Sequence, residues 1–336
     1  MKGFLNWLFG QKKGAFPAAD RTYSALPDLV FREDTTLPIV VWGAHDKHAP
    51  NNENQKALDE FWTAIASAWL AKLGQALGGG YTVVESERFL LLSGLDDRPA
   101  KLMLDYVEKT RRRILRLLEN VASDTELGKV CIIVFRDADT YYRYVSNYFP
   151  EDGEFAQSGG MFIQAGYGHF VFTQADDMSY MEPTVAHELT HCLVQHLSIP
   201  AWLNEGLAVN TEQRFSPPLG RPLETPEELH EMHQTFWNAD TIQAFWSGKS
   251  WLIAGDSNKL SYDLAANFVR LAASDESAFK AFVNSANSSD GGEAAALSCL
   301  GFPLSHLAQA VLGEGDWKPK PESWKNGVEA GQFHRW

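Results

Sequence analysis

Two histidines and two glutamates carry the clearest chemical signal in this sequence. The run HELTH begins at His187, and the run WLNEGLA begins at Trp202 shortly after it. Residues four apart share one face of a helix, so the imidazoles of His187 and His191 would point the same way. Two nitrogen ligands at this spacing can hold one zinc ion, and the intervening Glu188 can reach a water on the metal. The sequence therefore predicts a metal site, with Glu205 as an acidic third ligand.

The surrounding residues predict that both runs are helical. Pro183 suits a first helical turn, where its missing N–H would have no helical partner anyway. From Thr184 to Leu197 the apolar positions recur at helical spacing. Pro200 ends this helix, because proline disfavours helical geometry in the preceding residue. A second helix is predicted to start near Ala201, and the tight connection would bring Glu205 back to the two histidines.

The stretch HELTH…PAWLNEGLAVNTEQ resembles the motif pattern of gluzincin metallopeptidases, most closely that of the peptidase MA-like family. The resemblance can be followed from about Tyr81 to about Trp317. In aminopeptidase-N-like and thermolysin-like members, the glutamate that matches Glu205 is the third zinc ligand. Many gluzincins also use a tyrosine or histidine from a later helix to hydrogen-bond the oxyanion. Tyr262, at the start of the amphipathic run Ser261–Ala273, matches that position; the alternative is a tyrosine packed at a helix end.

The resemblance implies one zinc ion per chain, held by His187, His191 and Glu205, and hydrolysis of peptide bonds. A zinc-bound water would be activated by Glu188 as general base, and Tyr262 would stabilise the oxyanion. The sequence lacks a G-x-M-E-N exopeptidase signature, which favours an endopeptidase of restricted specificity acting on peptides or proteins. The alternative is a non-catalytic peptide- or protein-binding protein on an inherited metallopeptidase fold. The intact motif argues against that alternative, because decay usually removes the base or a ligand first.

The order of elements predicts an α+β fold of the zincin-like type. It would consist of a twisted mixed sheet with an edge hairpin, a largely helical C-terminal half, and an active-site cleft between them. Strands are predicted at Leu37–Trp42, Tyr81–Leu92 (one or two) and Val130–Phe135, and helices at Asn54–Leu77, Lys101–Val121, Ala138–Val145 and Glu227–Phe245. The chain then divides into an N-terminal extension (1–36), a mixed α/β part (37–178), a helical part with the metal site (179–315) and a tail (316–336).

Residues Gly160–Phe172 predict a hairpin, because two apolar runs flank a turn that contains glycines. The gluzincin resemblance implies that this hairpin forms one wall of the substrate groove. Its open edge would bind an extended peptide by adding a strand. Tyr167 and His169 would then reach the substrate; the alternative is that both are surface turn residues. The pairs His45/His48 and His230/His233 are predicted to be surface histidines.

Composition narrows the class of protein. A formal net charge of -14 over 336 residues argues against nucleic acid or an anionic membrane as the main partner. The hydrophobic content of 45% allows a full core, as one large or two closely packed domains. The cysteines are odd in number and widely spaced, which predicts small buried side chains in a reducing compartment, the cytoplasm; they are Cys131, Cys192 and Cys299.

The N-terminal run MKGFLNWLFG is the only candidate for membrane contact. No segment has the roughly eighteen apolar residues that a transmembrane helix needs. The run is broken by Asn6 and followed by Lys12 and Lys13, the reverse of a secretory signal. We expect a short leader that docks on the domain or is loosely ordered, with weak membrane-surface contact as the alternative.

Overall fold

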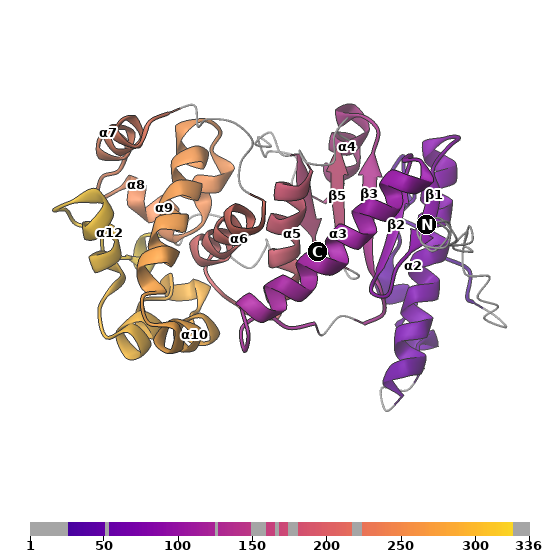
Figure 1. Ribbon diagram of the computed structural model, residues 1–336, viewed down its shortest axis with the longest axis horizontal. Coiled ribbons are helices and arrows are strands. Elements are labelled where there is room, and N and C mark those ends of the chain that lie inside the picture. Colours follow the sequence, from indigo (N-terminus) through magenta and orange to yellow (C-terminus); the bar gives the residue numbers. More distant parts are fainter. Residues whose placement is uncertain are drawn as a thin grey trace, which may run out of the picture.

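A five-stranded mixed sheet forms one half of the molecule, and a group of helices forms the other half (Figure 1). The computed structural model describes residues 26–50, 54–124, 127–148, 159–164, 168–173, 181–216 and 224–324. The expected leader at 1–10, Tyr167 in the hairpin turn, and residues 325–336 of the tail lie outside these ranges. The α+β class with a mixed sheet is confirmed.

The sheet has the strand order β1-β2-β3-β5-β4. The two outer pairs, β1 with β2 and β5 with β4, are antiparallel, whereas β3 runs parallel to both of its neighbours. The predicted hairpin is therefore present, and its first strand is an edge of the sheet. The strands are Thr82–Glu85 (β1), Phe89–Ser93 (β2), Val130–Phe135 (β3), Gly160–Ile163 (β4) and His169–Thr173 (β5).

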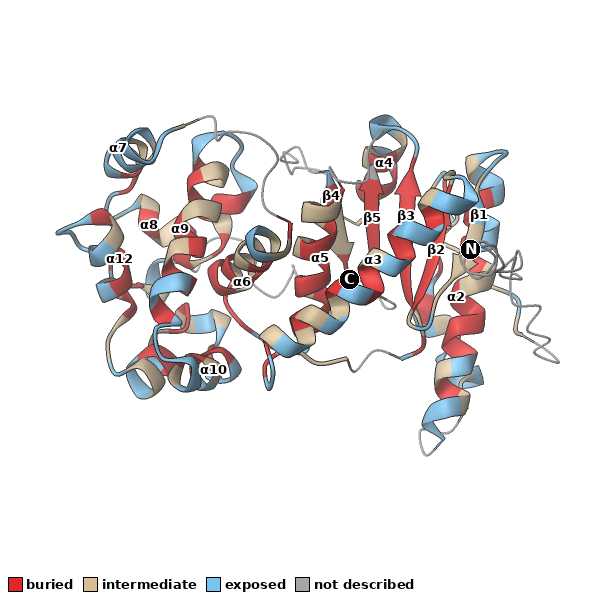
Figure 2. Ribbon diagram, in the orientation of Figure 1, coloured by how far each residue is buried: buried red, intermediate tan, exposed pale blue. Residues whose placement is uncertain are grey.

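Helices cover both faces of this sheet because the inner strands are apolar on both sides. All residues of β2 and β3 are buried (Figure 2). Alternate side chains of β2, β3 and β5 join one cluster with α3 and α5 and a second cluster with α2 and α4. These helices are Gln55–Leu77 (α2), Asp97–Leu117 (α3), Ala138–Val145 (α4) and Glu182–Val194 (α5).

The strand predicted at Leu37–Trp42 is wrong. Only Val40 pairs there, in an isolated bridge with Phe31, and a 3-10 turn begins at Trp42. The apolar side chains of this run are instead buried against α2, and Trp69 of that helix donates a hydrogen bond to the Pro38 carbonyl. Pro38 has no N–H for a strand ladder. The apolar side chains of this run are therefore buried by packing against α2, without the run joining a sheet.

The second half of the molecule is built from short helices around an aromatic core. Trp202 lies at its centre, fully buried against four aromatic rings, and its indole N–H donates to the Gly291 carbonyl. The helix predicted at 227–245 is two helices, because Asn238 makes capping bonds at the break. The helices are Ala201–Phe215 (α6), Pro226–Phe236 (α7), Thr241–Trp246 (α8), Asp256–Ala272 (α9), Glu276–Ser285 (α10), Glu293–Ala295 (α11) and Leu304–Leu312 (α12).

Helix α6 lies between α5 and α9, and these are the two most extensive helix pairings among the described residues. Gly206 permits the close approach of α6 to α9. A Cβ at this position would lie 2.6 Å from the Ala265 carbonyl oxygen and 2.6 Å from Cγ2 of Val269. Buried residues of the sheet and of α6 to α12 belong to one continuous cluster. The two halves of the molecule therefore share a core.

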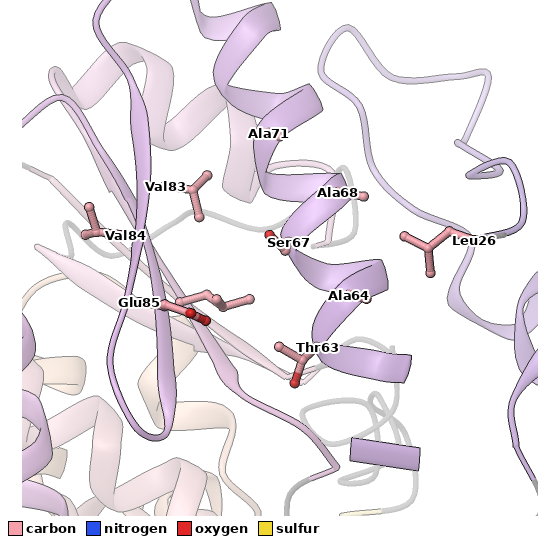
Figure 3. A pocket seen from close by; sticks show the side chains of 10 residues that line it. Leu26, Thr63, Ala64, Ser67, Ala68, Ala71, Val83, Val84 and Glu85 are labelled. Atoms are coloured by element: carbon pink, nitrogen blue, oxygen red, sulfur yellow. The ribbon is translucent and has the colours of Figure 1, made fainter. Parts of the chain in front are cut away.

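Two further features of the fold lie away from the two histidines. A cavity of about 250 Å³ separates α2 from β1, on the opposite face of the sheet from α5 (Figure 3). Within the described residues no single helix has the length and apolar character to cross a membrane. The pair Glu293–Leu300 and Leu304–Leu312 passes that test only jointly, and it is bent by 91°.

Candidate metal centre

Helices α5 and α6 bring the predicted ligands together. Pro183 lies in the first turn of α5, and Pro200 caps α6, as the sequence predicts. The connection is short, so α6 folds back against α5. One ligand atom each from His187, His191 and Glu205 lies within 4.8 Å of the other two.

The two distances from Glu205 to the histidines match ligand spacing around a tetrahedral zinc ion. Oε2 of Glu205 lies 3.2 Å from Nε2 of His187 and 3.4 Å from Nε2 of His191. Ligands about 2.0–2.1 Å from a tetrahedral zinc lie about 3.3–3.4 Å from one another. The two nitrogens and the carboxylate oxygen are also ligand types that zinc prefers. The donor set and its spacing therefore suit this metal.

The other ring nitrogen of each histidine has a partner on α6. Nδ1 of His187 lies 3.0 Å from Oε2 of Glu212, and Nδ1 of His191 lies 3.0 Å from Oδ1 of Asn204. An acceptor at Nδ1 favours a proton on that nitrogen, so Nε2 is the ring nitrogen available to a metal ion. Sequence analysis missed both partners. Glu212 follows Glu205 by two helical turns on the same face, and that spacing could have identified it.

The charges in the cluster favour an anionic Glu205. Burial acts to raise the pKa of its carboxyl group, but His191 and His187 together lower that pKa far below the usual value. Burial likewise acts to lower the pKa of His187, yet its hydrogen bonds with Glu205 and Glu212 raise it well above normal. Glu205 is thus a carboxylate, which is the form that binds a cation.

Glu188 lies beside the cluster and is 9% exposed. Burial raises the pKa of its carboxyl group, against the opposing effect of His187 and His191. Its Oε2 accepts a hydrogen bond of 2.7 Å from the main-chain N–H of Phe162 in the edge strand β4. The predicted base therefore touches both the metal helix and the sheet edge.

Tyr262 reaches the cluster from α9. Its ring centroid lies 6.1 Å from that of His187 and 6.2 Å from that of Trp251. The helix begins at Asp256, so Tyr262 lies in the second turn rather than at the helix start that the sequence suggested. Burial raises the pKa of its hydroxyl well above the usual value, and the carboxylates of Glu205 and Glu188 add to this shift. The hydroxyl remains protonated at neutral pH and is able to donate a hydrogen bond.

Three histidines that the sequence placed at the surface or near substrate are buried. His169 belongs to β5 and packs against Trp69, while its Nε2 meets the Tyr144 hydroxyl at 2.9 Å. This is the sheet face opposite α5, so both expectations for His169 are wrong. His45 and His233 are 1% and 3% exposed, and His233 bridges Trp237 and Asp263. His233 is a structural side chain rather than a surface histidine.

Comparison with known protein families and with curated proteins gave no match for this chain. The geometry of α5, α6, α9 and β4 therefore carries the functional argument.

Proposed function

We propose that this protein is a zinc-dependent peptidase with a zincin-like fold. The observation that carries the proposal is the convergence of His187, His191 and Glu205, whose ligand atoms lie within 4.8 Å of one another, with Glu188 and Tyr262 beside them. One zinc ion per chain would be held by the first three residues. Cys131 and Cys192 are buried thiols and Cys299 is a partly exposed one, which supports a reducing, cytoplasmic location as part of the proposal.

Each residue of the cluster has a role in this proposal. Bound zinc supplies an acidified water and a Lewis acid for the substrate carbonyl. Glu188 takes the proton of the attacking water and returns it to the leaving amine. Tyr262 donates its hydroxyl hydrogen to the oxygen that becomes negative as the carbonyl is attacked. Glu212 and Asn204 keep the imidazole rings in the orientation that presents Nε2.

The first experiment measures zinc in the purified protein and digestion of a broad peptide library. We expect about one zinc per chain and internal cleavage of peptides. His187→Ala and His191→Ala should lose the bound zinc, whereas Glu188→Gln should keep the zinc and lose most hydrolysis, because an amide cannot accept the proton. Zinc with peptide binding but no cleavage would support a non-catalytic binding protein. Full zinc retention in both histidine variants would overturn the metal site.

The proposed cleavage mode is endoproteolytic, with the substrate extended along the β4 edge of the sheet. An edge strand contacts the main chain of several substrate residues, which favours internal bonds over chain ends. The product pattern on a mid-length peptide tests this mode. Internal cuts in a peptide with a blocked N-terminus support it, whereas stepwise release of single N-terminal residues would contradict it.

A further inference from the structure

The edge strand β4 touches the candidate base through its main chain. Phe162 donates its N–H to Oε2 of Glu188 at 2.7 Å, and Glu188 lies on α5, between the two histidines in sequence. The bond joins a strand and a helix that are far from adjacent along the chain. It therefore depends on how closely β4 approaches α5.

The pairing register explains why this N–H is directed away from the sheet. In an antiparallel pair, residues alternate between those that bond the partner strand and those that face outward. Phe162 is opposite Phe170, and its N–H goes to Glu188. The main-chain N–H and C=O groups of Met161 and Ile163 must then point toward β5, where these residues lie opposite Val171 and His169. The outer edge of β4 presents the main chain of Phe162 to the metal helix.

A glycine sets the distance between the strand and the helix. A Cβ on Gly160 would lie 2.7 Å from Cγ2 of Thr184, and it would also collide with the ring of Phe172. Thr184 precedes Glu188 by one helical turn on the same face of α5. Only a glycine at position 160 lets β4 lie close enough for the next outward N–H, that of Phe162, to reach the carboxylate.

We propose that the main chain of β4 positions the catalytic base, with the Phe162 N–H holding Oε2 of Glu188 so that Oε1 faces the reacting water. This inference rests on the proposed peptidase function, and it makes Phe162 a positioning residue that acts through its backbone. A single donor to one oxygen fixes the carboxylate rotation and leaves the other oxygen as the proton acceptor. Because the Phe162 N–H is already bonded to Glu188, a substrate strand along β4 would hydrogen-bond to other main-chain groups of the strand.

The contact itself is tested without activity, by residue-resolved amide hydrogen exchange on the metal-free protein. We expect Glu188→Ala to accelerate exchange of the Phe162 amide by about tenfold or more, because that N–H loses its charged acceptor. Glu188→Gln retains a carbonyl acceptor and should keep most of the protection. The amides of Met161 and Ile163 serve as internal controls, because their partners lie in β5. Equal Phe162 exchange in the parent and Glu188→Ala, or equal acceleration of all three amides, would overturn the inference.

The catalytic consequence is tested with a matched pair of substitutions. Phe162→Pro removes the N–H at an outward edge position, where proline does not break the ladder to β5. Phe162→Val loses the same aromatic ring, keeps the N–H and suits a strand. We expect kcat to fall by about 10- to 100-fold in Phe162→Pro relative to Phe162→Val, with similar KM and equal zinc content.

Equal kcat in these two variants would overturn the positioning role while leaving the peptidase proposal intact. If the parent protein shows no hydrolysis although Glu188→Ala exposes the Phe162 amide, the peptidase proposal fails and the backbone contact stands. The two failures are therefore distinguishable.

Discussion

In each candidate ligand histidine, Nδ1 hydrogen-bonds a side chain of α6 that is not a candidate ligand, and Nε2 points toward Glu205. The protein-side partners, Glu212 for His187 and Asn204 for His191, both come from α6. One helix thus carries one candidate ligand and orients the two candidate ligands of its neighbour. A hydrogen bond donated to an anionic acceptor is stronger than one donated to a neutral acceptor. Glu212 should therefore matter more than Asn204 for metal affinity.

Glu212→Gln tests this orientation. We expect zinc affinity to fall by about 10- to 100-fold, because the amide orients His187 less firmly and makes it a weaker donor. Competition with a chelator measures the affinity, and circular dichroism checks that the fold is intact. Glu231→Gln, an exposed acidic residue on α7, is the control for the loss of one negative charge and should bind zinc as the parent does. Equal affinities in the two variants would contradict the role of Glu212.

Much of the site could be predicted from sequence because its signals are local. The spacing of His187 and His191 needs only a helix; Pro183 marks the start of that helix and Pro200 the start of the next. The contact between Phe162 and Glu188 could not be predicted, because it depends on which way each residue of β4 faces. Pairing with β5 decides which residues of β4 direct their main-chain groups outward, and a shift of the pairing register by one residue would reverse the pattern. The burial of His233 likewise depends on Asp263, which belongs to another helix.

The same alternation of main-chain directions determines which hydrogen bond a proline would remove from the edge strand. Ile163 faces β5, so Ile163→Pro would remove a bond within the hairpin rather than a donor on the outer edge. Phe162 is the position where a proline changes only the outer edge. The sequence pattern predicts the hairpin, but it does not show which residues of β4 face β5 and which face the outer edge.

Among the helices, α6 carries Glu205 and α9 carries Tyr262, so the spacing of these two helices bears on how the two side chains meet. Gly206 follows the ligand directly and packs against the Ala265 carbonyl. We expect Gly206→Ala to push α6 away from α9, to lower the free energy of unfolding by about 1–3 kcal/mol, and to weaken zinc binding. Denaturant unfolding and zinc titration measure the two effects.

Gly255→Ala is not a suitable control, because Gly255 has a positive φ of 85° and any side chain there would be strained. Gly79→Ala is better matched, since a Cβ there meets nothing within 4 Å and the φ is not in the left-handed region. Unchanged zinc affinity in Gly206→Ala would show that the helix spacing does not govern the site.

At the scale of the whole molecule, the site draws on both halves. Phe162 belongs to the sheet, Glu188 and Glu205 to α5 and α6, and Tyr262 to the helical half, and one continuous core joins them. We expect the two halves to lose structure together. Trp202→Ala should lower the free energy of unfolding by about 3–5 kcal/mol, because it empties the centre of the aromatic core.

Two probes report on this coupling. Amide hydrogen exchange in α6 to α12 follows the helical half, and labelling of Cys131 follows the sheet, since that thiol is 0% exposed in β3. Coincident transitions in Trp202→Ala support a shared core. A helical transition that leaves Cys131 protected would show that the halves unfold separately.

The three cysteine thiols are buried to different extents. The order in which a reagent labels them therefore reports the order in which parts of the protein open. Cys299 is partly exposed, Cys192 is buried on α5, and Cys131 lies in the central strand, where burial raises the pKa of its thiol. Because the thiolate is the reactive form, a maleimide should label them in that order. A metal that ties α5 to α6 would slow the labelling of Cys192 and leave the labelling of Cys299 unchanged.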